Sequence, residues 1–125
     1  MAKSTNLKQA RFGLDVFPNP APGRDYVIRH VAPEFTSRCP QTGQPDFGTV
    51  TIEYTPAKLC VELKSLKLYL QAFREQGIFY EALTNRLLDE LVAVLAPRHL
   101  RVTTDWRPRG GMSSVVIAEH PALRR

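Results

Sequence analysis

The sequence predicts an α+β domain in which two helices cover one face of a four-stranded antiparallel sheet. Two stretches with the alternating pattern of strands come first, two stretches with helical spacing follow, and two alternating stretches end the chain. Strands that are adjacent in sequence and joined by turns favour antiparallel pairing. The 125 residues suffice for one such two-layer domain with a modest core.

The first pair of strands is expected at residues 26–31 and 47–54, where neighbouring side chains alternate between two faces. Residues 34–46 lie between them and contain two prolines and one glycine, so we expect a loop there. Pro56 ends the second strand.

The helical pair follows. Apolar residues recur at helical spacing from Lys64 onward, and Gly77 is a natural C-terminal stop for this first helix. A second helix is expected at about residues 79–95, where leucines and valines form one stripe, and Pro97 ends it.

The second pair of strands is expected at residues 100–107 and 112–118, joined by a basic turn at 109–111. A four-stranded sheet has two exposed edges, and sheet edges pair readily with other chains. We therefore expect subunits to join into a ring with a continuous sheet.

The two ends of the chain carry weaker signals. Residues 1–24 show no sustained periodicity and are expected to form an arm that packs on a surface or on a neighbouring subunit. Residues 25–119 form the single predicted domain, and 120–125 form a basic tail.

Composition excludes several classes of protein. The longest apolar run has six residues, whereas a membrane span needs about 20. No secretory signal is recognisable at the N-terminus, so we expect a cytoplasmic protein. Two cysteines and three isolated histidines supply neither a disulfide framework nor the ligand spacing of a zinc site. The formal charge of +5 suits anionic ligands, phosphates or RNA among them, although a solvated basic surface explains it equally well.

The segment around Cys39 carries the clearest chemical signal. A cation such as Arg38 beside a thiol lowers its pKa, and the thiolate is the nucleophile. Asp46 lies seven residues further on, with turn residues between, so its carboxyl group can approach the sulfur. A cysteine with a carboxylic acid suits covalent addition followed by proton donation. The common alternative is a buried, inert cysteine and an ordinary turn aspartate.

Cys60 lies between apolar neighbours and is interpreted as packed and inert. A bridge between Cys39 and Cys60 stays open at this point, although it would consume the nucleophile.

Three further places could bind anions or a base. Lys64 and Lys67 share a helical face on which both can reach a phosphate, and Ser65 near the helix start would add backbone donors. Arg109 lies in a glycine-containing turn where the backbone can approach a phosphate. The Glu81 carboxylate could accept the paired N–H donors of a guanine-like edge. Each site also has a simpler interpretation. The lysines can be solvated, the arginine turn can be an ordinary basic turn, and the glutamate can be favoured by the helix dipole alone.

Together these motifs resemble the QueF family, the NADPH-dependent 7-cyano-7-deazaguanine reductases of queuosine biosynthesis. The resemblance spans residues 35–114 and rests on the joint order of three motifs. They read Phe35-Thr-Ser-Arg-Cys-Pro-Gln-Thr-Gly-Gln-Pro-Asp-Phe47, Glu62-Leu-Lys-Ser-Leu-Lys-Leu-Tyr69 and Pro108-Arg-Gly-Gly111. The family has the tunnelling fold, a strand-strand-helix-helix-strand-strand unit related to that of GTP cyclohydrolase I.

The resemblance implies a role for each motif. Cys39 would add to the nitrile carbon as a covalent thioimide, and Asp46 would donate the proton. The substrate-binding residues would be Val61, Glu62, Leu63, Tyr80 and Glu81, and the cofactor-binding residues Lys64, Ser65, Lys67 and Arg109.

It also implies a small-molecule substrate, two NADPH per turnover and no metal. The active sites would lie between the subunits of a pentamer-based homo-oligomer, often a decamer, without contact to a membrane or directly to a nucleic acid. At one position the chain departs from the family pattern, because Tyr80 stands where many relatives have histidine. A phenol can stack on a base, but its ordinary pKa near 10 makes it a poor proton shuttle at neutral pH.

Two other functions fit parts of the sequence. An archaeosine-type amidinotransferase acts on the same nitrile in tRNA with the same cysteine and aspartate, but it lacks the NADPH signature that this chain keeps. A non-catalytic basic RNA-binding module would place stacking aromatics on one sheet face with its lysines and arginines.

Overall fold

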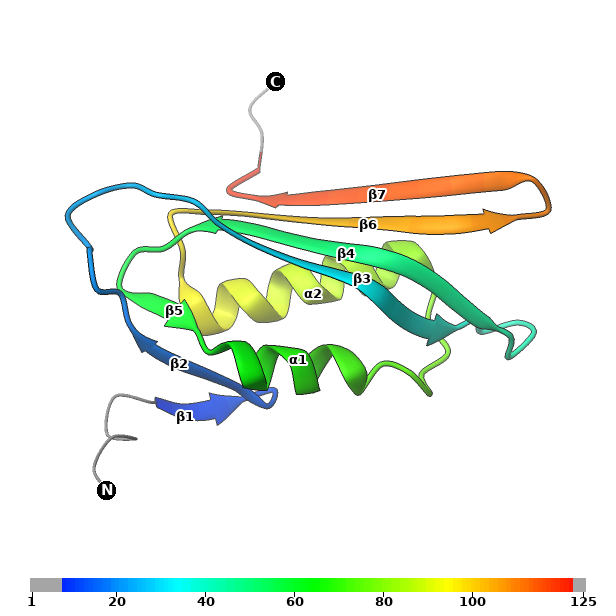
Figure 1. Cartoon of the computed structure of the whole chain (residues 1–125), viewed down its shortest axis with the longest axis horizontal. Helices are drawn as coiled ribbons and strands as arrows, with labels where there is room; N and C mark the ends of the chain where they lie inside the picture. Colours follow the sequence, from blue (N-terminus) through cyan, green and yellow to red (C-terminus); the bar gives the residue numbers. More distant parts are fainter. Residues whose placement is uncertain (1–7, 123–125) are drawn as a thin grey trace.

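The structure is a computed structural model, and it describes residues 8–122. Nine elements follow one another within these described residues (Figure 1). They are β1 (Lys8–Arg11), β2 (Leu14–Pro18), β3 (Ile28–Arg38), β4 (Pro45–Thr55), β5 (Leu59–Val61), α1 (Leu63–Gln71), α2 (Tyr80–Leu95), β6 (His99–Arg109) and β7 (Met112–His120). No described helix has the length and apolar character needed to span a membrane.

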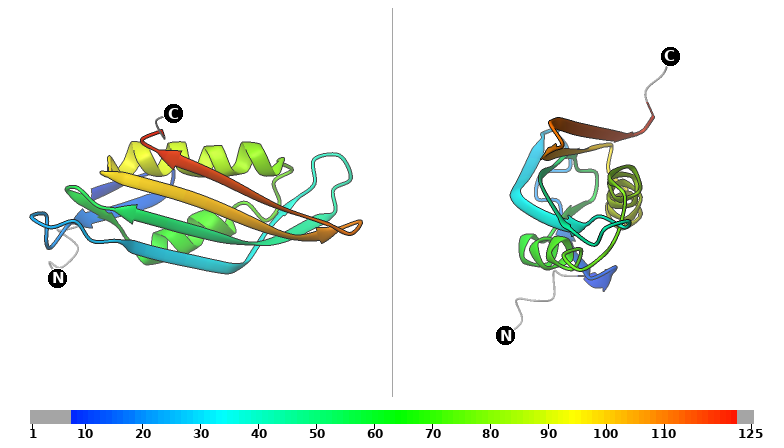
Figure 2. Two further views of the ribbon diagram at one scale, coloured as in Figure 1. Left: turned by 90° about the horizontal axis from the view of Figure 1, so that it is seen from above. Right: turned by 90° about the vertical axis from the view of Figure 1, so that its right-hand side faces the viewer.

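The main sheet has the strand order β3-β4-β6-β7, and all neighbours are antiparallel. Both helices lie on one face of this sheet, as the two views of Figure 2 show. The predicted α+β architecture is therefore confirmed. Strands β3 and β7 form the two edges of the sheet within one chain.

The core lies between the sheet and the helices. Every second side chain of β4 and β6 points toward the helices, so Val50, Ile52 and Val102 are almost fully buried. Leu83, Leu87 and Leu91 form the buried stripe of α2 that packs against them.

The predicted loop at 34–46 is shorter in the structure, because strand pairing continues from Phe35 to Arg38 and resumes at Pro45. Only residues 39–44 connect the two strands. The loop was predicted too long because both prolines were interpreted as loop residues. Pro40 does lie in the turn, but Pro45 is the first residue of β4, a position where a strand tolerates proline.

A second sheet, with the order β1-β2-β5, was not predicted. Val16 of β2 pairs with Val61 of β5, and Leu14 is fully buried in the core. Residues 8–18, expected to belong to an arm, thus pack on their own chain. Residues 1–7 and 123–125, parts of the expected arm and tail, lie outside the described residues.

Candidate active site

The bend between β3 and β4 holds Cys39 in place. The backbone N–H of Cys39 donates to the Gln44 carbonyl at 2.8 Å, and the N–H of Gly43 donates to the Cys39 carbonyl at 2.8 Å. Gly43 has φ +74°, a conformation that glycine adopts without strain. The Arg38 guanidinium donates to the Gly43 carbonyl at 2.9 Å, so the bend is fixed from both sides.

A cavity of about 360 Å3 opens beside this bend, between the start of α2 and the ends of β4, β6 and β7. It brings together five residues that the sequence singled out. They are Cys39, Asp46, Tyr80, Glu81 and Arg109.

Asp46 and Arg109 form an ion pair across this cavity. The Asp46 side chain is 3% exposed, because residue 46 faces inward on β4, and Arg109 Nη1 donates to its Oδ1. The hydrogen bond and the negative charge of Asp46 raise the pKa of Arg109. A buried carboxyl group is costly without a partner, and Arg109 is the cationic partner of Asp46 at the cavity wall.

The Cys39 thiol is half-buried, and its pKa is lowered. The main cause is hydrogen bonding from the Thr42 hydroxyl, followed by the backbone N–H groups of Thr42 and Gln41; burial and the charge of Asp46 oppose it. We expected the Arg38 cation to lower the pKa of Cys39. That expectation is wrong, because Arg38 forms an ion pair with Glu75, with Nη2 2.8 Å from Oε1.

Replacing Thr42 with Ala is expected to raise the pKa of Cys39. Since the thiolate is the reactive form, the loss of reactivity on acidification should begin at a higher pH than in the unaltered chain. The measurement is the rate of Cys39 alkylation by iodoacetamide across pH, followed by intact mass. Thr42→Ser keeps the hydroxyl and serves as the control; coincident profiles for all three proteins would contradict this assignment.

Tyr80 is held by an aromatic stack and a buried hydrogen-bond network. Its ring lies parallel to Trp106 with centroids 4.1 Å apart. The Trp106 indole donates to Thr104 Oγ1 at 2.8 Å, and the Thr104 and Thr84 hydroxyls share a hydrogen bond of 2.7 Å. Burial, and then the charge of Asp46, raise the pKa of Tyr80, so its hydroxyl remains a neutral hydrogen-bonding group beside that carboxylate.

The other predicted substrate residues lie elsewhere in the chain. Val61 is buried in β5, whereas Leu63 at the start of α1 is 60% exposed. The Glu62 carboxylate caps α1 by accepting from the N–H groups of Lys64 at 2.9 Å and Ser65 at 2.7 Å. These hydrogen bonds lower the pKa of Glu62. Within one chain this segment does not line the Cys39 cavity.

Ser65 does not fit its predicted role. Its N–H is taken by Glu62, and its hydroxyl donates to the Glu62 carbonyl and accepts from the Asp15 N–H at 2.9 Å. It therefore has no free donor for a phosphate, contrary to the expectation. Lys64 and Lys67 do share a face, and they line a mainly apolar cavity of about 440 Å3 between α1 and β3.

The chain matches known proteins along most of its length. A family model described as QueF-like protein covers residues 45–124. The chain is 58% identical over 108 residues to the NADPH-dependent 7-cyano-7-deazaguanine reductase of Rhodopirellula baltica, covering 86% of this chain and 89% of that one. It belongs to the QueF family. The enzyme of the same name from Chlorobium phaeovibrioides is also 58% identical, over 87% of this chain and 94% of that one.

A solved structure confirms the fold of this QueF-family chain. The crystal structure of the archaeosine synthase QueF-Like in the apo form superposes with a TM-score of 0.73 at 24% identity. The match covers 78% of this chain and 96% of that one. At this identity the likeness shows the fold alone.

Sequence reasoning assigned no role to the support beneath Tyr80 in this QueF-family chain. Trp106 was placed on a strand, but not under Tyr80, which lies 26 positions earlier. The sequence did contain one signal, a glycine at position 48 inside a predicted strand. In the structure Gly48 pairs with Trp106, and a Cβ at position 48 would come within 2.9 Å of the indole. A glycine inside a strand often marks such a close approach.

Proposed function

We propose that this chain uses NADPH to reduce the nitrile of 7-cyano-7-deazaguanine to the primary amine 7-aminomethyl-7-deazaguanine, as a step of queuosine biosynthesis. The observation that carries the proposal is the shared cavity of Cys39, whose pKa is lowered, and Asp46, the buried acid. The relatives with 58% identity that are named for this reaction support it.

The first step joins the protein to the substrate. The Cys39 thiolate attacks the nitrile carbon, a carbon–sulfur bond forms, and the triple bond becomes the double bond of a thioimide. The protonated Asp46 carboxyl group gives its proton to the nitrile nitrogen, and the carboxylate that remains is reprotonated from solvent, which received the proton of the Cys39 thiol. The proton lost by the thiol balances the one placed on nitrogen, so this addition needs no net proton.

NADPH, when bound, supplies a hydride, and two such cofactors per turnover account for the four electrons that separate a nitrile from an amine. Cys39 leaves as a thiolate after the first reduction, which frees it for another cycle. Asp46, once reprotonated, is again the proposed proton donor for the nitrogen. The residues proposed to hold the cofactor are Lys64, Lys67 and Arg109; no metal is required by this scheme.

Glu81 is proposed to recognise the base. It lies in the first turn of α2 on the cavity wall, where an ionised carboxylate can accept the ring N–H and the exocyclic amine together. Tyr80 would stack on the same base.

Replacing Glu81 with Ala should weaken binding of the nitrile substrate about 100-fold, because two charge-assisted hydrogen bonds are lost. Calorimetry on a Cys39→Ala background isolates non-covalent binding. Asp89→Ala removes another exposed acid of the same helix and is the control. Unchanged affinity in Glu81→Ala would remove the recognition role.

We also propose that the complete site forms between subunits of a pentamer-based ring, with Val61, Glu62 and Leu63 supplied by a neighbouring copy. Neither edge strand pairs with a further strand among the described residues of one chain, and large apolar side chains are exposed around both edges. These are Val31 at 53%, Leu63 at 60%, Phe79 at 53%, Met112 at 74%, Val115 at 54% and Ile117 at 58% exposure. A cytoplasmic location agrees with this proposal.

Cofactor consumption tests the proposed reaction. Oxidation of NADPH should depend on the nitrile, with two NADPH oxidised for each amine formed. Incorporation of ammonia into tRNA without NADPH oxidation would instead identify an amidinotransferase. Salt-sensitive RNA binding without thiol reactivity would indicate a binding module.

A further inference from the structure

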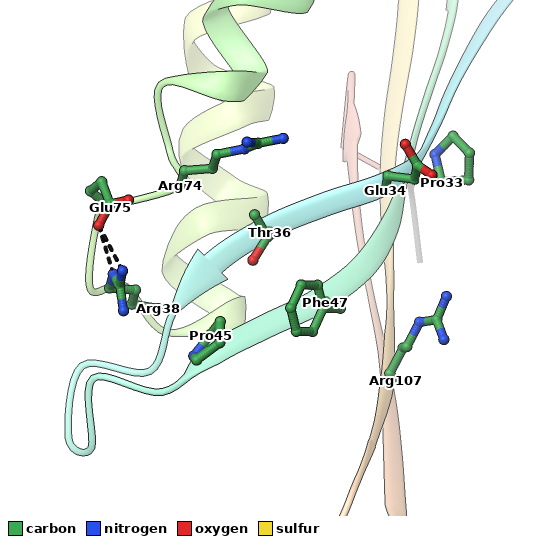
Figure 3. Close-up of a pocket in the computed structure, with 9 residues that line it drawn as sticks. All are labelled: Pro33, Glu34, Thr36, Arg38, Pro45, Phe47, Arg74, Glu75 and Arg107. Carbon is green, nitrogen blue, oxygen red and sulfur yellow. Dashed lines mark hydrogen bonds and ion pairs between the residues drawn. The ribbon is translucent and has the colours of Figure 1, made fainter.

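Three adjoining cavities follow the ends of β3, β4 and β6. The Cys39 cavity shares Asp46, Arg107 and Arg109 with a cavity of about 300 Å3. That one shares Phe47 and Arg107 with a third cavity of about 640 Å3. Figure 3 shows this third cavity, which we call the arginine groove and define by Glu34, Arg38, Phe47, Arg74, Glu75 and Arg107.

The charges of the arginine groove are not balanced. Arg38 is neutralised by Glu75, with Nη2 2.8 Å from Oε1. Arg74 and Arg107 form no ion pair and no side-chain hydrogen bond with any residue of the part of the chain that the structure describes. Glu34, at the far rim beside Pro33, is the one remaining carboxylate of the lining. The groove thus offers two free guanidinium groups from different elements, a donor set suited to a phosphate.

An exposed aromatic ring lies between these two cations. The alternation of β4 turns Asp46 and Gly48 inward, so Phe47 points outward into the groove and is 50% exposed. Aromatic faces in ligand sites stack against planar bases. Phe47 pairs with Thr36, which precedes Cys39 by three residues. At the strand rise per residue, Phe47 therefore lies about 10 Å from Cys39 along the strand direction.

We propose that the arginine groove binds the adenosine end of NADPH, with Phe47 against the adenine and Arg74 and Arg107 on the 2′-phosphate. This inference rests on the proposed function and deepens it. Shared lining residues place the three cavities next to one another between that end and Cys39, where the hydride is needed. A smaller cavity lined by Lys67 and Arg74 extends the positive lining toward α1. The groove would thereby distinguish NADPH from NADH, which lacks the 2′-phosphate.

The test uses calorimetry on the full chain with two probes, 2′,5′-ADP and 5′-AMP, which differ by the 2′-phosphate alone. Arg74→Gln and Arg107→Gln should each weaken 2′,5′-ADP binding about 10-fold and leave 5′-AMP unchanged, because each removes one charge-assisted contact. Phe47→Leu should weaken both probes. Arg24→Gln removes an exposed arginine that does not line the groove and is the matched control. Thermal melting of each variant verifies folding.

The outcomes separate this inference from the proposed function. If 2′,5′-ADP binds the three groove variants as tightly as it binds the control, the groove assignment is overturned. The groove assignment is also overturned if the unaltered chain binds 2′,5′-ADP no more tightly than 5′-AMP. It is overturned as well if RNA binds in the groove and neither 2′,5′-ADP nor 5′-AMP competes with it. Formation of a nitrile adduct on Cys39 of the unaltered chain, measured without cofactor, tests the proposed function independently of these titrations.

Discussion

Asp46→Asn is expected to lower nitrile reduction by about 10²- to 10⁴-fold, the usual contribution of a general acid, while making the Cys39 thiol more reactive toward iodoacetamide. The two effects have opposite signs for a physical reason. The amide has no proton of suitable acidity to give to the nitrile nitrogen. At the same time, the negative charge of Asp46 raises the pKa of Cys39, so its removal lowers that pKa and increases the thiolate fraction at neutral pH.

The opposite signs distinguish two roles for Asp46. If it served as the base that activates Cys39, Asn at this position would slow both alkylation and nitrile reduction. The amide keeps an oxygen that can accept from Arg109, so the pairing of β4 and β6 is retained. Arg109→Gln is an informative companion variant because it leaves the acid in place without its cationic partner. Parallel loss of alkylation and reduction in Asp46→Asn would refute the donor role.

Cys39→Ala is expected to lower nitrile-dependent NADPH oxidation by at least about 10⁴-fold, as removal of a covalent nucleophile does elsewhere. A nitrile accepts hydride poorly, and only addition of sulfur converts it to the more reactive thioimide. The fold should survive, because the side chain is half-buried in a bend held by backbone hydrogen bonds.

Cys60→Ala provides the control for this variant. Cys60 is 3% exposed in β5, away from the cavity, so its replacement should lower stability slightly through lost packing and preserve the reaction. Residual reduction in Cys39→Ala comparable to that in Cys60→Ala would mean that Cys39 is not the nucleophile.

The main sheet and both helices could be predicted because their periodicities extend over many residues. Strand β4 alternates through eleven residues, and α2 has a buried stripe that continues to Leu95, two residues before Pro97. The small sheet could not be predicted, since β1, β2 and β5 have three to five residues each. Pairing between Val16 and Val61 joins segments far apart in sequence, which local periodicity does not detect.

The candidate site shows the same division. Cys39 and Asp46 could be placed together because a single hairpin joins them, and the register Ser37 to Asp46 brings them to its closed end. The cause of the lowered pKa of the thiol could not be predicted, because it depends on how Thr42 folds back in the bend. The expected anion contact of Ser65 was wrong because the Glu62 carboxylate occupies its N–H, a contact that sequence spacing alone does not reveal.

Intact mass spectrometry of the unaltered chain mixed with 7-cyano-7-deazaguanine, in the absence of NADPH, tests the central claim most directly. The account predicts a mass increase equal to one whole nitrile molecule, located on Cys39 by peptide mapping and reversed when NADPH is added. No mass increase at saturating nitrile, or an increase located on any other residue, would contradict it.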